Sequence, residues 1–126
     1  MNEHEQKRVL VVDDNAPLRA TLRELLRWQG YRVDEAPDGA EALAVAIVAR
    51  PDVIVTDLEM PVVDGSTFIQ RCRELPGLNE VPIIVMSATE PETVKPRLRT
   101  ARVSAFLTKP FGLVELTTAI ERDESH

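Results

Sequence analysis

The sequence predicts an α/β fold in which a doubly wound parallel sheet carries helices on both of its faces. Short apolar runs rich in β-branched residues alternate with longer segments of helical periodicity, and this alternation continues along the whole chain. An apolar run such as residues 9–13 is typical of a strand that is buried on both faces of a parallel sheet. Together these observations favour one doubly wound (βα)5 sandwich with a five-stranded parallel sheet.

The strands and most of the helices can be placed from these patterns. The five strands are expected at residues 9–13, 31–36, 52–57, 81–87 and 104–108. Helices are expected between Asn15 and Gly30 and at residues 38–50, 66–75 and 112–124. Asn15 can cap the first helix, and Pro17 fits its first turn. Pro82 suits only the first position of its strand, because proline cannot donate a hydrogen bond to a sheet.

The segment between the fourth and fifth strands does not predict a regular helix. Pro91 can begin a helix, but Pro96 would fall in its interior, where it removes a backbone donor and clashes with the preceding turn at a cost of about 3 kcal/mol. Lys95, which precedes this proline, is pushed toward an extended conformation. We therefore expect a short, kinked or displaced fourth helix, with regular turns mainly from Pro96 to about Arg102.

The composition is that of an ordinary globular protein. With 126 residues, 44% of them hydrophobic and 29% charged, the chain fits a single domain, whose core we place at residues 8–122 with residues 1–7 and 123–126 frayed. The net charge of −6 argues against nucleic-acid binding, which needs clustered Lys and Arg. The single cysteine, Cys72, excludes an internal disulfide. Because no apolar stretch approaches membrane-spanning length, we expect a cytoplasmic protein without membrane contact.

Polar side chains gather at one edge of the predicted sheet. Doubly wound sheets carry their working residues at the carboxyl ends of the strands. The first strand ends in Asp13 and Asp14, the third in Asp57 and the fourth in Ser87, while the fifth leads to Lys109. Carboxylates, a hydroxyl and an ammonium group therefore meet at this edge, and the opposite strand ends carry no comparable set.

This set of groups indicates metal-assisted phosphoryl chemistry. Clustered carboxylates raise each other's proton affinity unless a cation lies between them, and Mg²⁺ is the usual ion for oxygen ligands. Mg²⁺ beside a lysine suits a phosphoryl group, to which a carboxylate can add as a nucleophile. Asp57 is the best candidate because it ends the central strand. The only histidines, His4 and His126, lie at the chain ends, which argues against histidine-based catalysis, and the glycines match no phosphate-binding loop.

Four stretches resemble the signature of a known family. VLVVDDN, VIVTDLEMPVVDG, IIVMSA and FLTKPF are similar, in order and spacing, to the motifs of the response regulator receiver domain of two-component systems. The resemblance covers about residues 8–122 and implies the flavodoxin-like receiver topology with strand order 2-1-3-4-5. It also implies a phosphoprotein in which Asp57 accepts a phosphoryl group from a sensor histidine kinase or a histidine phosphotransfer protein.

The resemblance implies a metal site at the phosphoacceptor. Asp14 and Asp57 would ligate Mg²⁺ directly together with the backbone carbonyl of Glu59, and Asp13 would act directly or through water. The side chain of Glu59 projects beside the site, and both a solvated side chain and an effect on the lifetime of the phosphoryl group remain open.

The resemblance also implies a switch. Ser87 would hydrogen-bond to the phosphoryl oxygens, Lys109 would pair with them, and Phe106 would turn inward as Ser87 moves. An aromatic residue on a short strand can equally be part of the core, so both interpretations of Phe106 remain open. The residues expected to shape the loop after the phosphoacceptor are Met60, Pro61, Asp64 and Gly65.

The predicted function is therefore a phosphorylation-activated signalling switch rather than an enzyme that acts on a separate substrate. Phosphorylation would alter the face formed by the fourth helix, the fifth strand and the last helix, and so control a protein partner or an output domain outside this chain. The resemblance leaves a phosphorylation-dependent homodimer open. One alternative is a receiver-fold binding module that signals without phosphate. Another is a Mg²⁺-dependent aspartyl-phosphate phosphatase with Glu59 as its second acid, although 126 residues leave no room for a cap.

Overall fold

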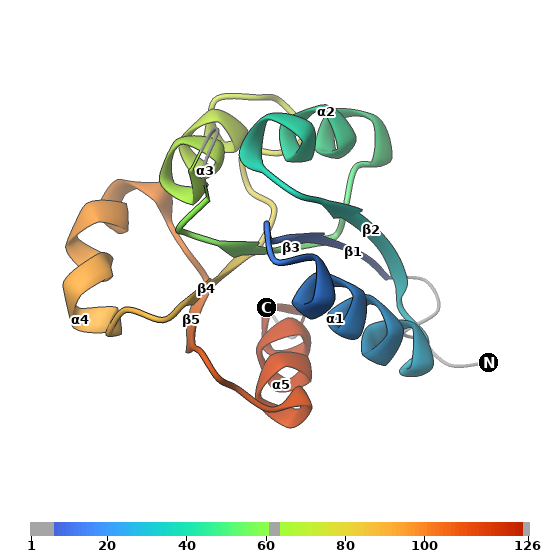
Figure 1. Ribbon diagram of the computed structural model, residues 1–126. Helices are drawn as coiled ribbons and strands as arrows, with labels where there is room; N and C mark the ends of the chain where they lie inside the picture. The colour runs from blue at the N-terminus through green and yellow to red at the C-terminus, as the bar shows by residue number, and fades with distance from the viewer. Residues whose placement is uncertain (1–6, 61–63, 125–126) are drawn as a thin grey trace.

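The computed structural model describes residues 7–60 and 64–124, which form one five-stranded parallel sheet flanked by helices (Figure 1). The strands are β1 Arg8–Val12, β2 Arg32–Ala36, β3 Val53–Asp57, β4 Ile83–Ser87 and β5 Ala105–Thr108. The helices are α1 Ala16–Trp28, α2 Gly39–Ala49, α3 Gly65–Arg73, α4 Pro91–Val94 and α5 Leu113–Glu124, with the 3-10 helix η2 Lys95–Ala101 directly after α4. The strand order β2-β1-β3-β4-β5 confirms the predicted topology.

The sheet is buried on both faces. Successive side chains of a strand point to opposite faces, and so Leu10 and Ile54 pack with residues of α2, α3 and η2, whereas Val11 and Val55 pack with residues of α1 and α5. Figure 1 shows these two helical layers on either side of the sheet. Double-sided burial explains why β1, β3 and β4 appear in the sequence as continuous apolar runs.

The helices that follow β1, β2 and β3 begin at side-chain caps. The side chain of Asn15 accepts a hydrogen bond from the backbone N–H of Leu18 at 3.0 Å, as predicted, and Gly30, at φ 101°, follows the end of α1. The carboxylates of Asp38 and Asp64 cap α2 and α3 in the same way. Each cap satisfies a backbone donor that has no partner within its helix. The caps therefore fix where these helices start, at the carboxyl edge of the sheet.

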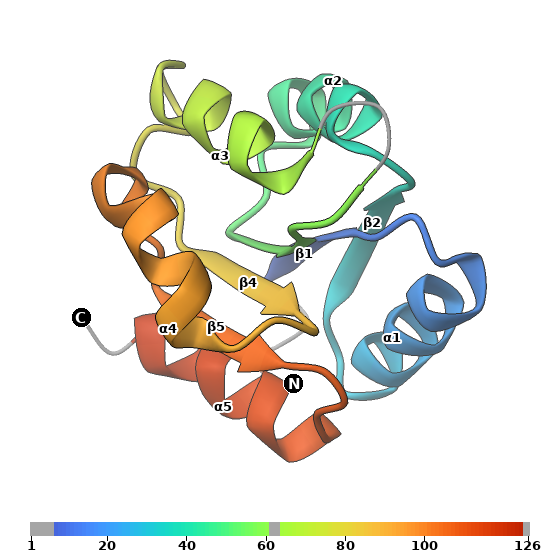
Figure 2. The same cartoon turned by 60° about the vertical axis from the view of Figure 1, so that its left-hand side comes forward.

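The fourth helical segment is broken, as predicted, into a short α-helix and a 3-10 helix. Helix α4 comprises only Pro91–Val94, and the chain continues as the 3-10 helix η2. Most of the helical turns therefore lie in η2, close to the predicted range from Pro96 to about Arg102. The prediction of an extended Lys95 was wrong, because this residue has φ −54° and ψ −44°. Because Pro96 has no N–H, it cannot bond to a carbonyl one turn back, and the chain tightens into 3-10 turns. Figure 2 shows this segment beside β5.

The last helix ends where the sequence predicts. Helix α5 continues to Glu124, and fraying of the chain ends stays a prediction. The predictions for His4, His126 and Pro61 lie outside the described residues. No helix in the described ranges is long and apolar enough to cross a membrane.

Candidate functional site

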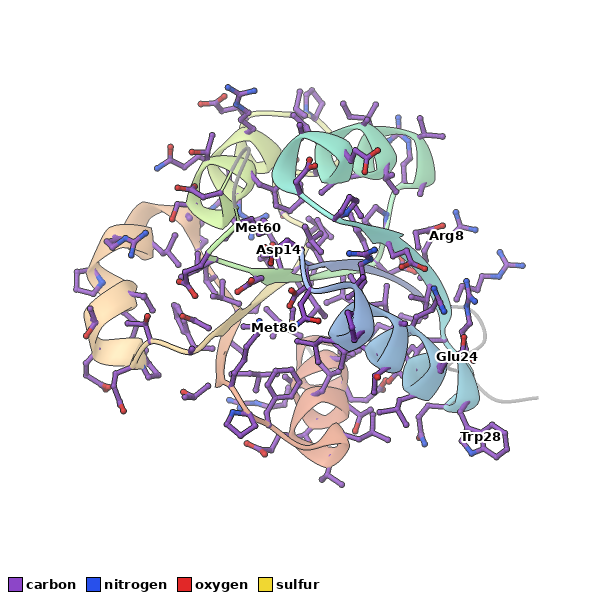
Figure 3. All side chains as sticks on the ribbon, viewed as in Figure 1. Arg8, Asp14, Glu24, Trp28, Met60 and Met86 are labelled. Atoms are coloured by element: carbon purple, nitrogen blue, oxygen red, sulfur yellow. The ribbon has the colours of Figure 1, made fainter. Side chains whose placement is uncertain are left out.

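Three carboxylates meet at the carboxyl edge of the sheet. Asp57 is the last residue of β3, and Asp13 and Asp14 directly follow the neighbouring strand β1. One carboxylate oxygen from each residue lies within 4.8 Å of the other two. Figure 3 shows Asp14 well away from Arg8, which begins β1 at the opposite edge. Asp13 and Asp57 are buried whereas Asp14 is exposed, so the cluster opens to solvent on one side.

Asp13 is held by several hydrogen bonds. Its Oδ2 accepts from Lys109 Nζ at 3.0 Å, and its Oδ1 accepts from the backbone N–H of Asn15 at 2.9 Å. Its own N–H donates to the carbonyl of Ala36 at 3.2 Å. Lys109 Nζ also lies 3.5 Å from Asp57 Oδ1. In the state described, Lys109 thus occupies the space between the two buried carboxylates.

The charges in this cluster are unbalanced. Burial raises the pKa of Asp57 to about 6; the charge of Lys109 opposes this rise, and the charges of Asp13 and Glu59 add to it. Burial also lowers the pKa of Lys109, but the hydrogen bond and charge of Asp13, together with Asp57, outweigh it and leave that pKa above its ordinary value. One ammonium group offsets one carboxylate. A divalent cation would therefore neutralise the remaining charge of the three carboxylates.

The residues present fit a Mg²⁺ ion. Octahedral Mg²⁺ holds oxygens at about 2.0–2.1 Å, which places pairs of ligand oxygens about 3–4 Å apart. The separation of at most 4.8 Å among the three carboxylate oxygens therefore needs only a small closure. The exposed side of the cluster gives room for the waters that Mg²⁺ retains. Ligation by the backbone carbonyl of Glu59 remains a prediction.

Millimolar Mg²⁺ is expected to raise the melting temperature of the protein, but not that of Asp14→Ala. A cation that binds only the native state stabilises it by mass action, which corresponds to a rise of about 3–6 °C once the site is nearly saturated. Scanning calorimetry of protein first treated with a chelator would measure the rise. Glu24→Ala is the matched control, because Glu24 is an exposed acid that lies apart from Asp14 (Figure 3). Equal rises in Asp14→Ala and the wild type would count against this site.

Ser87 is engaged by Glu59 rather than by the phosphoacceptor. Its hydroxyl donates to the two carboxylate oxygens of Glu59 at 3.2 Å each and accepts from the backbone N–H of Thr89 at 3.0 Å. One hydrogen shared between two oxygens makes a long and weak bond. Glu59 is therefore exposed but not merely solvated. Residue spacing does not predict this contact; its only signal in the sequence is that Ser87 ends β4 and Glu59 closely follows the neighbouring strand β3.

Phe106 belongs both to the core and to the surface. Its ring packs against the buried cluster on the α3 side of the sheet, and the ammonium group of Lys95 lies 5.6 Å from the ring centroid. The ring also lines a surface hollow of about 430 Å³. The other residues that line this hollow are Lys95, Pro96, Leu98, Arg102 and Val103. Both interpretations of Phe106 thus have a structural basis, and its role as a switch remains a prediction.

The loop after Asp57 returns very close to the end of β3. The backbone N–H of Gly65 donates to the carbonyl of Leu58 at 2.9 Å. A β-carbon on Gly65 would lie 2.3 Å from the carbonyl oxygen of Asp57 and 2.8 Å from the α-carbon of Leu58. Met60, three residues after Asp57, is buried in the core cluster. Glycine is therefore required at position 65 by the close approach of two backbones.

The comparison with protein families identifies the family of this chain. The family model of the response regulator receiver domain matches residues 9–121, and the chain belongs to this family. It is 41% identical over 114 residues to the transcriptional regulatory protein PrrA of Mycobacterium leprae, covering 90% of this chain and 48% of that protein. It is 39% identical over 116 residues to the transcriptional regulatory protein PdtaR of Mycobacterium tuberculosis, covering 91% and 55%. The chain thus spans about half the length of these relatives.

A third relative is a kinase. The chain is 39% identical over 118 residues to the sensor histidine kinase TmoS of Ectopseudomonas mendocina, covering 94% of this chain but only 12% of that protein. Receiver domains therefore occur both in regulators and within a kinase among the proteins that this chain resembles.

Solved structures confirm the fold. The chemotaxis response regulator CheY4 of Vibrio cholerae has a TM-score of 0.85 and 36% identity, covering 92% of this chain and 97% of that one. The receiver domain of the sensor histidine kinase PA1611 of Pseudomonas aeruginosa, with a magnesium ion coordinated in its active-site cleft, has a TM-score of 0.85 and 31% identity over 92% and 95%. The response regulator TrrA of Thermotoga maritima, in complex with Mg²⁺-BeF, has a TM-score of 0.82 and 29% identity over 93% and 98%.

Proposed function

We propose that this receiver domain is a phosphorylation-activated switch of a two-component phosphorelay, with Asp57 as the phosphoacceptor. The observation that carries the proposal is the convergence of Asp13, Asp14 and Asp57 within 4.8 Å, with Lys109 Nζ 3.5 Å from Asp57. A candidate nucleophile, a candidate metal site and an ammonium group thereby meet at one edge of the sheet. The donor would be a phosphohistidine of a sensor histidine kinase or of a histidine phosphotransfer protein, which accords with family membership.

The chemistry is an in-line transfer to a carboxylate. An ionised oxygen of Asp57 attacks phosphorus, the P–O bond forms as the P–N bond of the donor breaks, and the imidazole nitrogen keeps the electron pair. With a pKa of about 6, Asp57 is mostly ionised at neutral pH. Asp14, Asp57 and the carbonyl of Glu59 would hold Mg²⁺, with Asp13 direct or through water, and the ion would neutralise charge on the phosphoryl oxygens. Lys109 exchanges its carboxylate partners for one of these oxygens.

The switch follows from the contacts of Ser87. Its hydroxyl must leave Glu59 to donate to a phosphoryl oxygen, and that exchange draws the end of β4 toward the site. Phe106 on β5 is paired in register with Val85 of β4, which lies two residues before Ser87 on the same strand. A shift of β4 would therefore alter the hollow lined by Phe106 and the face formed by α4, β5 and α5. This face would control a protein partner, an output domain or a homodimer.

In the proposed function, the protein catalyses only its own phosphorylation and dephosphorylation. The phosphatase alternative requires a cap over the substrate, and the described residues form a single sheet with its covering helices. The presence of all the carboxylates, the hydroxyl and the lysine at one edge favours a phosphate-dependent switch over a binding module that works without phosphate.

Beryllium fluoride with Mg²⁺, a mimic of the phosphoryl group, tests the proposal. We expect it to change the amide spectrum of the wild type, and acetyl phosphate to add one phosphoryl group by mass, with both effects lost in Asp57→Asn. Asp52→Asn is the matched control, since Asp52 precedes β3 at the opposite edge of the sheet, and it should respond as the wild type does. An unchanged wild-type spectrum would favour the phosphate-independent module. Steady release of phosphate from a small monoester would favour the phosphatase.

A further inference from the structure

Arg19, near the start of α1, contacts the backbone of the carboxylate cluster. Its Nη1 donates to the carbonyl oxygen of Asp13 at 2.6 Å, and its Nε donates to Oε1 of Glu35 at 2.9 Å. Only 17% of its side chain is exposed, which is low for an arginine on a surface helix. The first turn of α1 contains no acidic residue that could pair with it locally. The planar guanidinium group thus spans a carbonyl at the site and a carboxylate on β2.

The carbonyl that Arg19 holds belongs to the peptide that joins Asp13 to Asp14. Because a peptide group is planar, fixing the direction of this carbonyl also fixes the position of the α-carbon of Asp14. Asp14 lies between β1 and α1 and belongs to neither element. The bonds of Asp13 to Lys109 and Asn15 hold its side chain. Arg19 is therefore the side chain that orients the peptide leading to Asp14.

Glu35 anchors Arg19 from the neighbouring strand. Its Oε2 accepts from Nη1 of Arg23, one turn further along α1, at 2.5 Å. The hydrogen bonds from Arg23 and Arg19 lower the pKa of Glu35 against the opposing effect of burial. Glu35 therefore stays ionised and gives Arg19 a fixed partner. Arg23 shares Glu35 and also pairs with Glu24, whereas Arg19 is bonded to Asp13.

We infer that Arg19 is a positioning residue for the metal site: by holding the Asp13 carbonyl, with Glu35 as its anchor, it orients the Asp14 carboxylate toward a divalent cation. The inference rests on the proposed Mg²⁺ site. Without Arg19, the peptide between the two aspartates gains rotational freedom that a bound cation must remove again. Outer-shell contacts of this kind govern metal affinity in proteins.

A positioning role and a purely electrostatic role of Arg19 predict opposite changes in Mg²⁺ affinity when Arg19 is removed. If Arg19 acted only through its positive charge, its removal would reduce repulsion of the cation and tighten binding. If it orients the peptide, its removal weakens binding. The sign of the change in the Mg²⁺ dissociation constant therefore separates the two roles.

The test compares Mg²⁺ binding by the wild type, Arg19→Gln and Arg23→Gln, measured by isothermal titration calorimetry and by the amide shifts of Asp14. Arg23→Gln is the matched control, because it removes an arginine from the same helix and the same carboxylate. We expect Arg19→Gln to raise the dissociation constant about threefold to tenfold, and Arg23→Gln to change it by less than about twofold. Melting temperatures without metal will show that both variants are folded at the temperature of the titration.

The variant Arg19→Lys separates the charge of Arg19 from the geometry of its guanidinium group. Arg19→Lys retains the charge but loses the planar group that spans the carbonyl and the carboxylate, and we expect it to weaken binding as well. Binding by Arg19→Gln that equals that of Arg23→Gln, or that is tighter than in the wild type, overturns the inference. If Arg19→Gln does not fold, wild-type affinity in Arg19→Lys overturns it. A wild type that does not bind Mg²⁺ overturns the proposed function, and the inference with it.

Discussion

Replacing Gly65 with alanine is expected to lower the free energy of unfolding by about 3 kcal/mol. The new β-carbon would lie 2.3 Å from the carbonyl oxygen of Asp57 and 2.8 Å from the α-carbon of Leu58. Both are backbone atoms, so no rotation of a side chain relieves the overlap, and either the end of β3 or the start of α3 must move. Because the phosphoacceptor ends β3, we also expect weaker Mg²⁺ binding.

Urea unfolding measures this loss, and Gly112→Ala is the control. A β-carbon on Gly112 would meet only Oε1 of Glu115 at 3.7 Å, an ordinary contact with a flexible side chain. The control should change the free energy of unfolding by less than about 1 kcal/mol. A loss in Gly65→Ala no larger than in Gly112→Ala would contradict the close backbone approach. The comparison removes the general effect of replacing glycine, because that effect is common to both variants.

The sheet and the members of its acidic cluster could be predicted because burial leaves a periodic pattern in the sequence. Residues 53–57 are buried on both faces and appear as an apolar run, and their parallel alignment with β1 brings Asp57 to the same edge as Asp13. The order of the strands across the sheet came from the family resemblance, since periodicity contains no information about lateral neighbours. The cap at Asn15 was predictable because its signal lies within a few residues.

The contacts that control the site were not predictable from spacing. The bond between Ser87 and Glu59 and the bond from Arg19 to Asp13 depend on side-chain directions that residue types do not specify. The tight approach of Gly65 likewise depends on the path of the loop.

The break at Pro96 was predictable from its missing donor, but the helical conformation of Lys95 was not. Val94 and Leu98, on either side of these two residues, are both buried in the core. Their packing outweighs the local preference of a residue before proline, as tertiary contacts commonly do.

At about pH 8 and without metal, Asp57→Asn is expected to be more stable than the wild type by about 2 kcal/mol. Burial raises the pKa of Asp57 from 3.8 to about 6, with Lys109 opposing the rise and Asp13 and Glu59 adding to it. A carboxyl whose pKa is higher in the folded state binds its proton more tightly there. Its contribution to stability is therefore complete below pH 3.8 and is lost as the pH rises through about 6.

Urea unfolding of both proteins in the presence of a chelator, at several values between about pH 4 and pH 8, measures the difference. It should be small at the acid end, grow as Asp57 ionises and become constant above its folded pKa. A difference that does not vary with pH would contradict ionisation of Asp57 as its source. Millimolar Mg²⁺ should then stabilise the wild type more than Asp57→Asn, because the cation binds the ionised carboxylate. The charge that destabilises the metal-free fold is thus the charge that holds the metal.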